Sequence, residues 1–342
     1  MILDQLEVPI VLAPLAGGPS TPELAAAVSG AGGLGFLAAG YLSAEALHDR
    51  ISAARALTTA PLGVNVFVPG TPSAADAVAE YAAALAQAGA ELGQPRFDDD
   101  SWDAKLALLT SEPVQVTSFT FGCPEPAVIA ELQAAGTEVW VTITSPDEAE
   151  LAARAGADVL VVQGNEAGGH RASFTDDPAR DDGFGLLALL QLVAGGLPMV
   201  AAGGIATGAG IAAVLTAGAS AAQLGTAFLR SPEAGTSPVH RAAVAESADT
   251  AMTRAFTGRL ARGIRNRFLD EHSLHAPSAY PEVHFLTAPL RAAGRSAGDA
   301  DVVNLWAGQA HELSRELAAA ELVAVLAEEA RVAVAAAARR LA

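Results

Sequence analysis

The sequence predicts an α/β fold, a (β/α)₈ TIM barrel, and three observations lead to this prediction. Eight short apolar runs recur at fairly regular intervals between residues 10 and 229. Alanine-rich stretches that begin with helix-start residues lie between them. Most of the runs are almost continuously hydrophobic, as expected of strands buried on both faces of a parallel sheet. Eight such strand–helix units that close on themselves form a barrel of this kind.

The predicted strands are taken in chain order. They are IVLAPL (10–15), LGFLAA (34–39), LGVNVFV (62–68), VQVTSFTF (114–121), VWVTIT (139–144), DVLVVQ (158–163), PMVAAG (198–203) and AAQLGTAFL (221–229). The competing architecture is an open, doubly wound sheet. It would need a glycine fingerprint after the first strand and an acidic residue closing the second. The run 34–39 ends without such an acid, which favours the barrel.

Two helices between these strands have recognisable first turns. Ser20-Thr21-Pro22-Glu23 places a proline and an acid where a helix begins, and Ser145-Pro146-Asp147-Glu148 repeats the pattern. The second of these helices is expected to end at Gly156, just before the strand 158–163. This gives a crossover of ordinary length between neighbouring parallel strands.

The regular alternation stops after Arg230. Residues 231–300 are interpreted as a mostly helical insertion after the eighth strand, large enough to act as a substrate lid. From Glu312 onward, apolar residues recur every three or four positions without a proline, which predicts an amphipathic helix. The predicted organisation is therefore a barrel (1–230), a lid (231–300) and a C-terminal helix that completes the barrel (301–342).

Charge and composition exclude several classes of partner. The chain has 342 residues, of which 38 are acidic and 20 basic, giving a net charge of −18. Nucleic acids and anionic membranes both attract basic surfaces, so neither is expected as a partner. Residues 183–229 carry no charge, but glycines and Pro198 interrupt this stretch too often for a membrane span. Because the N-terminus lacks the basic residues of a signal peptide, we expect a cytoplasmic protein.

The only cysteine, Cys123, allows no disulfide within the chain. We interpret it as a small buried hydrophobic residue rather than a catalytic thiol.

Glycines follow the last two predicted strands. Gly203 and Gly204 end the seventh, and Gln223, Leu224, Gly225 and Thr226 lie in the eighth. In a barrel, the loops after these two strands commonly bind a phosphate through backbone N–H groups. Tight turns also require glycine, but the coincidence with these two strands favours a phosphate site.

The sixth strand leads into the most informative segment, VVQGNEAGGHR (161–171). Gly168 and Gly169 let the backbone pass close to a ligand, and His170 can then project over it. Histidine is the usual base near neutral pH, although a single histidine is often structural. For Arg171 a phosphate contact is possible, but we favour a surface ion pair with Asp176 or Asp177.

No spacing of histidines, cysteines and acids typical of a metal site is found. A phosphate cradle and a base without a metal indicate an organic cofactor that carries a phosphate. The amides of Asn65 and Gln163 at strand ends could bond a planar heterocycle, or they could be ordinary satisfied polar groups. The pattern points to flavin mononucleotide (FMN).

Several stretches make the chain resemble the nitronate monooxygenase family, formerly called 2-nitropropane dioxygenases. They are APLAGGPSTPELAAAVSGAGGLGFL, GVNVFVPG, TSFTFGCP, VVQGNEAGGH, AAGGIATG, QLGTAFL and TGRLARGIRNRF. The resemblance implies that Asn65, Gln163 and Gly168 hold FMN. It implies that Gly204 and the run Gln223 to Thr226 bind its phosphate, and that His170 is the catalytic base.

The activity implied by this resemblance is oxidation of alkyl nitronates, and in some members nitroalkanes, by O₂ to nitrite and a carbonyl compound. No metal is needed, the partners are these small molecules, and an oligomer is compatible with the sequence. A protonated His170 would stabilise a bound nitronate anion. A neutral His170 would remove the α-proton of a nitroalkane.

Other functions remain open. FMN-dependent enoyl-ACP reductases and NAD(P)H:quinone reductases share the barrel and a similar EAGGH segment. The stretches ARGIRNRF (261–268) and LWAGQ (305–309) favour the monooxygenase. In the first of these, Arg262, Arg265 and Asn266 either anchor the lid or form a solvated helix face. A sensor or carrier that binds flavin or another phosphorylated ligand is the non-enzymatic alternative, and the position of His170 argues against it.

Overall fold

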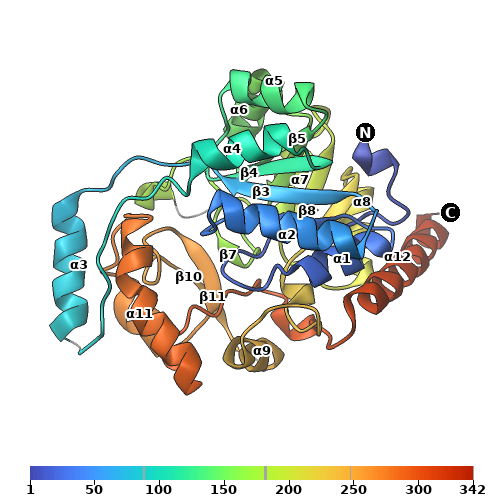
Figure 1. The fold of residues 1–342 in the computed structure, drawn as a ribbon. Helices are drawn as coiled ribbons and strands as arrows, with labels where there is room; N and C mark the ends of the chain where they lie inside the picture. The colour runs from blue at the N-terminus through green and yellow to red at the C-terminus, as the bar shows by residue number, and fades with distance from the viewer. Residues whose placement is uncertain (88, 181–182, 247, 342) are drawn as a thin grey trace.

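The barrel is closed. The computed structural model describes residues 1–87, 89–180, 183–246 and 248–341 (Figure 1). Eight parallel strands form one sheet in the order β1-β9-β8-β6-β5-β4-β3-β2. A parallel bridge between Val11 of β1 and Leu34, the residue just before β2, joins the first and last strands of this order. The predicted (β/α)₈ fold is therefore confirmed.

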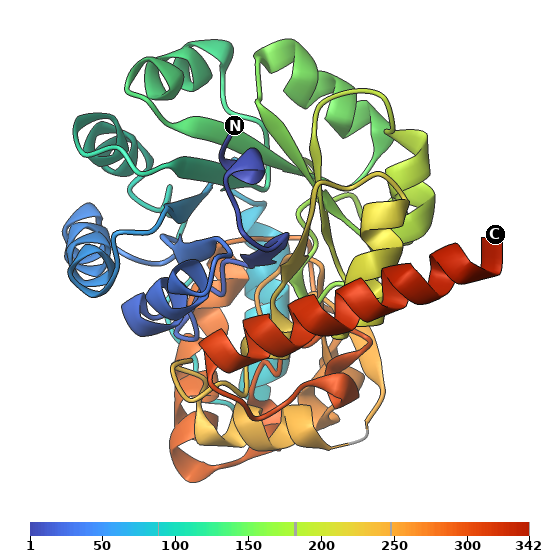
Figure 2. The same ribbon diagram turned by 90° about the vertical axis from the view of Figure 1, so that its right-hand side faces the viewer.

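Strands and helices alternate around this barrel, and Figure 2 shows the helices surrounding the strands. The strands are β1 (Ile10–Leu12), β2 (Gly35–Ala38), β3 (Leu62–Phe67), β4 (Val116–Thr120), β5 (Glu138–Ile143), β6 (Val159–Gln163), β8 (Met199–Ala202) and β9 (Ala221–Leu224). The surrounding helices are α1 (Pro22–Gly30), α2 (Ala44–Leu57), α4 (Trp102–Ser111), α5 (Pro126–Ala134), α6 (Pro146–Ala155), α7 (Leu186–Leu192), α8 (Gly208–Thr216) and α12 (Ala319–Leu341).

The two predicted helix starts are present. The side chain of Thr21 caps α1 by accepting from the Leu24 N–H at 3.0 Å. Ser145 caps α6 by accepting from the Glu148 N–H at 3.3 Å. Helix α6 then ends at Gly156, whose φ of 99° is the left-handed conformation that glycine adopts without strain.

The last strand and the last helix are shorter than predicted. The strand predicted at 221–229 ends at Leu224, because Thr226–Phe228 turn into the 3-10 helix η3. The final helix begins at Ala319 instead of Glu312, and residue 342 lies outside the described residues. Helix α12 packs on α8 and α1, and its C-terminal end extends past them (Figure 2).

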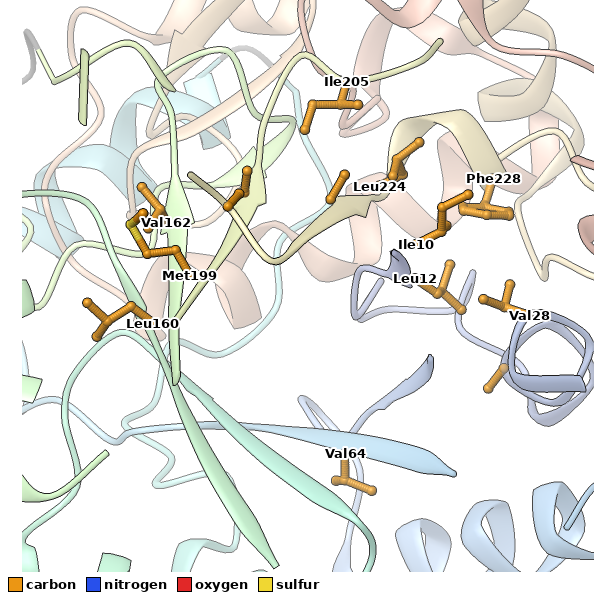
Figure 3. Close-up of a cluster of buried hydrophobic side chains, with 14 of the residues drawn as sticks. Ile10, Leu12, Val28, Val64, Leu160, Val162, Met199, Ile205, Leu224 and Phe228 are labelled. Carbon is orange, nitrogen blue, oxygen red and sulfur yellow. The ribbon is translucent and has the colours of Figure 1, made fainter. Parts of the chain in front are cut away.

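Hydrophobic side chains fill both sides of the strand cylinder. Inside, Val11, Phe36, Trp140 and Val159 belong to an apolar cluster that plugs the barrel, with the Phe36 and Trp140 ring centroids 5.7 Å apart. Outside, the alternate residues of each strand face the helices. Figure 3 shows this outer layer, including Ile10, Leu12, Val28, Leu160, Leu224 and Phe228.

The insertion is not only helical. It contains α9 (Pro238–Ala245), α10 (Arg267–His272) and α11 (Glu282–Ala297), and also the strands β10 (Thr250–Thr253) and β11 (Ala261–Ile264). Together with β7 (Gly169–His170) these strands form an antiparallel sheet in the order β10-β11-β7. The segment that carries His170 is thus paired directly with the insertion.

The insertion also packs against a segment that precedes residue 230. Helix α3 (Ala75–Gln87), which follows β3, lies beside α11 and away from the barrel helices (Figure 1). Its buried residues Val78, Tyr81 and Leu85 share a hydrophobic cluster with Phe256 and Val283 of the insertion. Residues from both sides of position 230 therefore build one unit at the C-terminal end of the strands.

Among the described residues, no helix combines the length and the apolar character needed to cross a membrane.

Candidate functional site

The inward-facing residues of the barrel become polar towards the C-terminal ends of the strands. Because side chains alternate along a strand, Val116 shares the interior with Ser118 and Thr120, and Val161 shares it with Gln163. Asn65 joins this layer from β3 and donates to Ser118 Oγ and Thr120 Oγ1, both at 2.9 Å. The apolar plug thus ends in a floor of hydrogen-bonding groups.

Above this floor lies a cavity of about 630 Å³, a size typical of sites for small organic ligands. Ten of the predicted site residues line it. They are Asn65, Gln163, Gly168, Gly169, His170, Gly203, Gly204, Gln223, Gly225 and Thr226. Leu224 does not, because it alternates with Gln223 along β9 and its buried side chain lies in the outer hydrophobic layer (Figure 3).

The ends of β8 and β9 present free backbone donors to the cavity. Among the described residues, the N–H groups of Gly203, Gly204, Gly225 and Thr226 have no hydrogen-bond acceptor. Gly203 and Gly204 have φ values of 121° and 68°, which favour glycine. A group of unpaired N–H donors at the ends of these two strands fits a phosphate.

The wall of the cavity also contains a buried, unpaired amide oxygen. Gln223 is buried, and its Oε1 atom has no hydrogen-bond partner among the described residues. A buried acceptor without a donor is unfavourable unless a ligand supplies one. These donors and this acceptor fit a phosphorylated heterocycle such as FMN.

Gln163 has a structural role in addition to the ligand contact that its position predicts. Its Nε2 donates to the carbonyl of His170 at 3.1 Å, and its Oε1 accepts from the Ala172 N–H at 2.9 Å. Both ends of the amide therefore hold the segment that carries His170. The second Nε2 proton is the group that remains for a ligand.

Aromatic rings enclose the imidazole of His170. The ring centroids of Phe121, Tyr280 and Trp306 lie 5.6, 5.7 and 5.6 Å from it. Burial, with a smaller contribution from the positive charge of Arg259, lowers the pKa of His170 to about 3. The side chain is therefore neutral near pH 7. Of the two roles predicted for His170, this favours accepting a proton over stabilising an anion by a positive charge.

Thr257 orients this imidazole. Its Oγ1 lies 2.9 Å from His170 Nε2 and donates to the Arg259 carbonyl at 3.3 Å. Since a hydroxyl has one proton, this arrangement favours an N–H on Nε2 and a lone pair on Nδ1. The insertion thus sets which ring nitrogen accepts a proton.

Several residues that line the cavity were not among the site residues predicted from the sequence. Tyr41 follows β2, His240 lies on α9, His284 and Arg291 lie on α11, and Trp306 precedes α12; all line the cavity. The pattern of α11 indicates only an amphipathic helix, so its docking over the barrel could not be foreseen. The spacing of His284 and Arg291, about two helical turns, is the one available hint.

The charge of the cavity is opposite to that of the whole protein. No carboxylate is among the described residues that line it, whereas Arg291 and Arg295 are. Arg291 is buried, and its bonds go to Thr287 Oγ1 and to the carbonyl of His284. In a chain of net charge −18, this is a local positive region, and its charge is suited to an anion.

The interpretation of Arg171 as a surface residue is wrong. Its side chain is buried and donates to the carbonyls of Gln163, at 2.6 Å, and Thr144, at 3.2 Å. The segment after β6 folds back over the barrel, so this arginine points inward and fastens the strand ends. Asp176 pairs instead with Arg254, at 2.8 Å.

The arginines of the stretch 261–268 divide between the two roles considered. Arg262 is buried in β11, where its Nε and Nη2 donate to the Asn165 carbonyl at 3.0 and 2.8 Å. It anchors the insertion to the loop after β6. Arg265 is exposed and pairs with Asp270, while Asn266 caps α10 by accepting from the Leu269 N–H.

Cys123 is partly buried against the hydrophobic core, and burial raises the pKa of its thiol to about 11. A thiol with so high a pKa is a poor nucleophile, as the sequence interpretation expected.

Comparison with known proteins gives a consistent result. The family model described as nitronate monooxygenase matches residues 2–329. A nitronate monooxygenase from Pseudomonas aeruginosa is 43% identical over 343 residues, covering 95% of this chain and 97% of that protein. A probable nitronate monooxygenase from Staphylococcus aureus is 37% identical, with 90% of each chain covered.

Solved structures show the same relationship. Nitroalkane oxidase from Streptomyces ansochromogenes is 52% identical and superimposes with a TM-score of 0.95 over 98% of this chain and 99% of its own. FabK from Thermotoga maritima is 28% identical with a TM-score of 0.78, over 99% and 98% of the two chains. The chain belongs to the nitronate monooxygenase family, whose members are oxidoreductases.

Proposed function

We propose that this enzyme uses FMN and O₂ to oxidise alkyl nitronates, and nitroalkanes after removal of a proton, to a carbonyl compound and nitrite. The observation that carries the proposal is a neutral histidine over a cavity that is rich in donors and free of carboxylates among the described residues. A nitronate is an anion, and a nitroalkane becomes one when it loses its α-proton. Such a cavity favours both the anion and its formation.

The residues that would hold FMN form two groups. The unpaired N–H groups of Gly203, Gly204, Gly225 and Thr226 would bind the phosphate. Asn65, Gln163 and Gln223 would bond the edge of the ring system, and Gly168 and Gly169 would let the backbone lie close to it. Bound FMN would supply the electron transfer from the substrate and the reaction with O₂.

His170 would then act in substrate activation. With a pKa near 3 it is unprotonated at neutral pH and can accept the α-proton of a nitroalkane. A nitronate has already lost this proton, so it needs binding and orientation but no base. The two substrates therefore depend on His170 to different degrees.

The insertion would serve as the lid of this site. Its residues Thr257, His284 and Arg291 line the cavity, and β11 pairs with the strand that carries His170. Covering the cavity would keep water away from the reacting groups, which strengthens the electrostatic interactions inside it.

The experiment is direct. The purified protein should be yellow, with the absorbance bands of oxidised flavin, and the released cofactor should be identified as FMN. With ethylnitronate or propyl-2-nitronate, O₂ uptake and nitrite release should rise together in the absence of a nicotinamide cofactor. Nitroethane should react more slowly, because its proton must first be removed.

A different outcome would identify the reductase alternatives. If nitronates gave no O₂ uptake, while NADH or NADPH bleached the flavin and supported reduction of an enoyl thioester or a quinone, the proposed oxidation would be wrong. A colourless protein that binds another phosphorylated ligand would contradict the flavin-dependent function altogether.

A further inference from the structure

Tyr41 occupies a strained position at the edge of the cavity. It follows β2 (Gly35–Ala38), and its φ of 68° lies in the left-handed region that a residue with a side chain rarely adopts. It lines the same cavity as His170 but belongs to none of the segments discussed so far as cofactor-binding. Such strain persists only where the surrounding structure holds it, and it is concentrated at functional sites.

A buried ion pair holds this backbone. The Tyr41 N–H donates to Asp100 Oδ1 at 2.8 Å, and the other carboxylate oxygen of Asp100 lies 2.7 Å from Lys105 Nζ. Lys105 is completely buried, and Asp100 is itself left-handed, with a φ of 58°. Because separating a buried ion pair is strongly destabilising, this pair helps to hold the backbone of Tyr41 in its conformation.

Neighbouring rings fix the aromatic side chain of Tyr41. His284 stacks on it with a centroid distance of 4.1 Å and an interplanar angle of 3°. Phe67 contacts it edge-on, with centroids 5.6 Å apart. With its backbone bonded and its ring in contact with two neighbouring rings, the phenol has little freedom to move.

The hydroxyl of Tyr41 is free to donate a hydrogen bond to a ligand. It accepts a hydrogen bond from the Tyr280 hydroxyl at 3.2 Å and donates to none of the described residues. Burial raises the pKa of Tyr41 to about 12, so the phenol stays protonated throughout the neutral range. Accepting one hydrogen bond also strengthens a hydroxyl as a donor in the next.

We propose that the Tyr41 hydroxyl donates a hydrogen bond to a negatively charged oxygen of the substrate bound beside His170. The proposal rests on the function proposed above, in which that substrate is a nitronate or becomes one. Tyr280 links the two residues, since its ring packs against His170 and its hydroxyl bonds to Tyr41. A donor fixed on one side and a base fixed on the other would set the position of the nitro group and of the α-carbon.

The ligand chemistry follows from the cavity. No carboxylate among its described lining residues competes for the proton of Tyr41, and Arg291 adds a positive charge nearby. A planar group with its negative charge spread over oxygen atoms fits this environment. Nitrate has this shape and charge and does not react, so it serves as a probe of binding alone.

The test uses the flavin-loaded protein and three variants. Tyr41→Phe removes the hydroxyl and keeps the ring. Tyr280→Phe removes only the hydrogen bond to Tyr41. Tyr81→Phe is the matched control, because the Tyr81 hydroxyl is buried in the cluster around α3 and donates to the Ala255 carbonyl away from the cavity. Nitrate affinity is measured by calorimetry, and kcat and KM are measured with a nitronate.

We expect Tyr41→Phe to raise the Kd of nitrate about 10-fold or more, as expected for the loss of a hydrogen bond to a charged group. The value of kcat/KM for the nitronate should fall by a similar factor at unchanged flavin content. Tyr280→Phe should change nitrate binding about threefold or less, and Tyr81→Phe should leave it unchanged.

A Kd for Tyr41→Phe within twofold of wild type, or no nitrate binding to the wild type, would overturn the role of Tyr41. The failure of the proposed reaction would look different. In that case nitrate binding would still respond to Tyr41→Phe, but the wild type would release no nitrite from a nitronate.

Discussion

At the scale of single residues, the site depends on keeping a histidine uncharged inside a protein. The rings of Phe121, Tyr280 and Trp306 surround His170, and Arg259 adds a positive charge nearby, so both burial and charge oppose protonation. Such a histidine is ready to accept a proton at any pH near neutrality. A histidine with so low a pKa is a weaker base than free imidazole. In the proposed reaction, the positive charge of the cavity would offset this weakness by stabilising the substrate anion.

This balance leads to a prediction for His170→Ala. Oxidation of a neutral nitroalkane should slow by about 10²- to 10⁴-fold, the usual contribution of a positioned base. Oxidation of the preformed nitronate should slow much less, because no proton must be removed. The measurement is kcat/KM for nitroethane and ethylnitronate side by side, together with the flavin content, which should not change.

His275→Ala is the control, since that side chain is exposed on the insertion. Equal losses on both substrates would assign His170 to binding, and undiminished activity on nitroethane would remove it from the mechanism.

At the scale of elements, the segment after β6 is fastened from three sides. Gln163 holds its turn, β11 pairs with Gly169 and His170, and the chain at residues 307–308 packs directly on Gly168. A Cβ atom at Gly168 would lie 2.4 Å from the carbonyl carbon of Ala307 and from the nitrogen of Gly308. Glycine is therefore required here by contact with the protein as well as by any ligand.

Gly168→Ala should consequently push this segment and the chain at 307–308 apart. We expect a loss of stability of about 1–3 kcal/mol, as for other overpacking substitutions. Activity and flavin content should both fall, because His170 and the cavity wall would shift. Urea unfolding and flavin absorbance measure the two effects.

Gly196→Ala is the matched control, since the nearest atom to its added carbon would be 3.6 Å away. Normal stability and flavin content in Gly168→Ala would show that the segment adapts, contrary to the tight packing described here.

The elements also show what the sequence could reveal and what it could not. The barrel strands and the glycines that end them were predictable, because buried strands and close turns constrain residue type locally. The strands β10 and β11 were not, since each has only four residues and β11 contains Arg262 and Gly263, so neither has a clear periodicity. The inward direction of Arg171 and the docking of His284 and Arg291 depend on contacts between distant segments, which no local pattern encodes.

At the scale of the whole molecule, three distant segments each bring a neutral histidine to one cavity. His170 follows β6, His240 lies on α9 and His284 lies on α11. Burial lowers the pKa of His170 to about 3 and that of His240 to about 4, and it holds the pKa of His284 well below its usual value. Because folding buries these histidines in their neutral form, the stability of the fold should depend on pH.

The direction of this linkage follows from proton uptake. In the unfolded chain these histidines bind protons as the pH falls through about 6.5. In the folded protein His170 does so only near pH 3 and His240 near pH 4, and burial holds the pKa of His284 well below its usual value. Between these limits the unfolded chain binds more protons, so acidification destabilises the fold. Each histidine contributes a slope of at most about 1.4 kcal/mol per pH unit.

We therefore expect the free energy of unfolding, measured with urea, to decrease from pH 7 to pH 5, and His240→Gln to make this decrease shallower. His240 Nε2 lies 2.9 Å from the Trp306 carbonyl, and a glutamine amide can donate the same hydrogen bond without taking up a proton. His275→Gln, at an exposed position, should keep the slope of the wild type. If His240→Gln also kept that slope, the burial of a neutral His240 within the insertion would not be coupled to folding, and the pH dependence would have to arise from other groups.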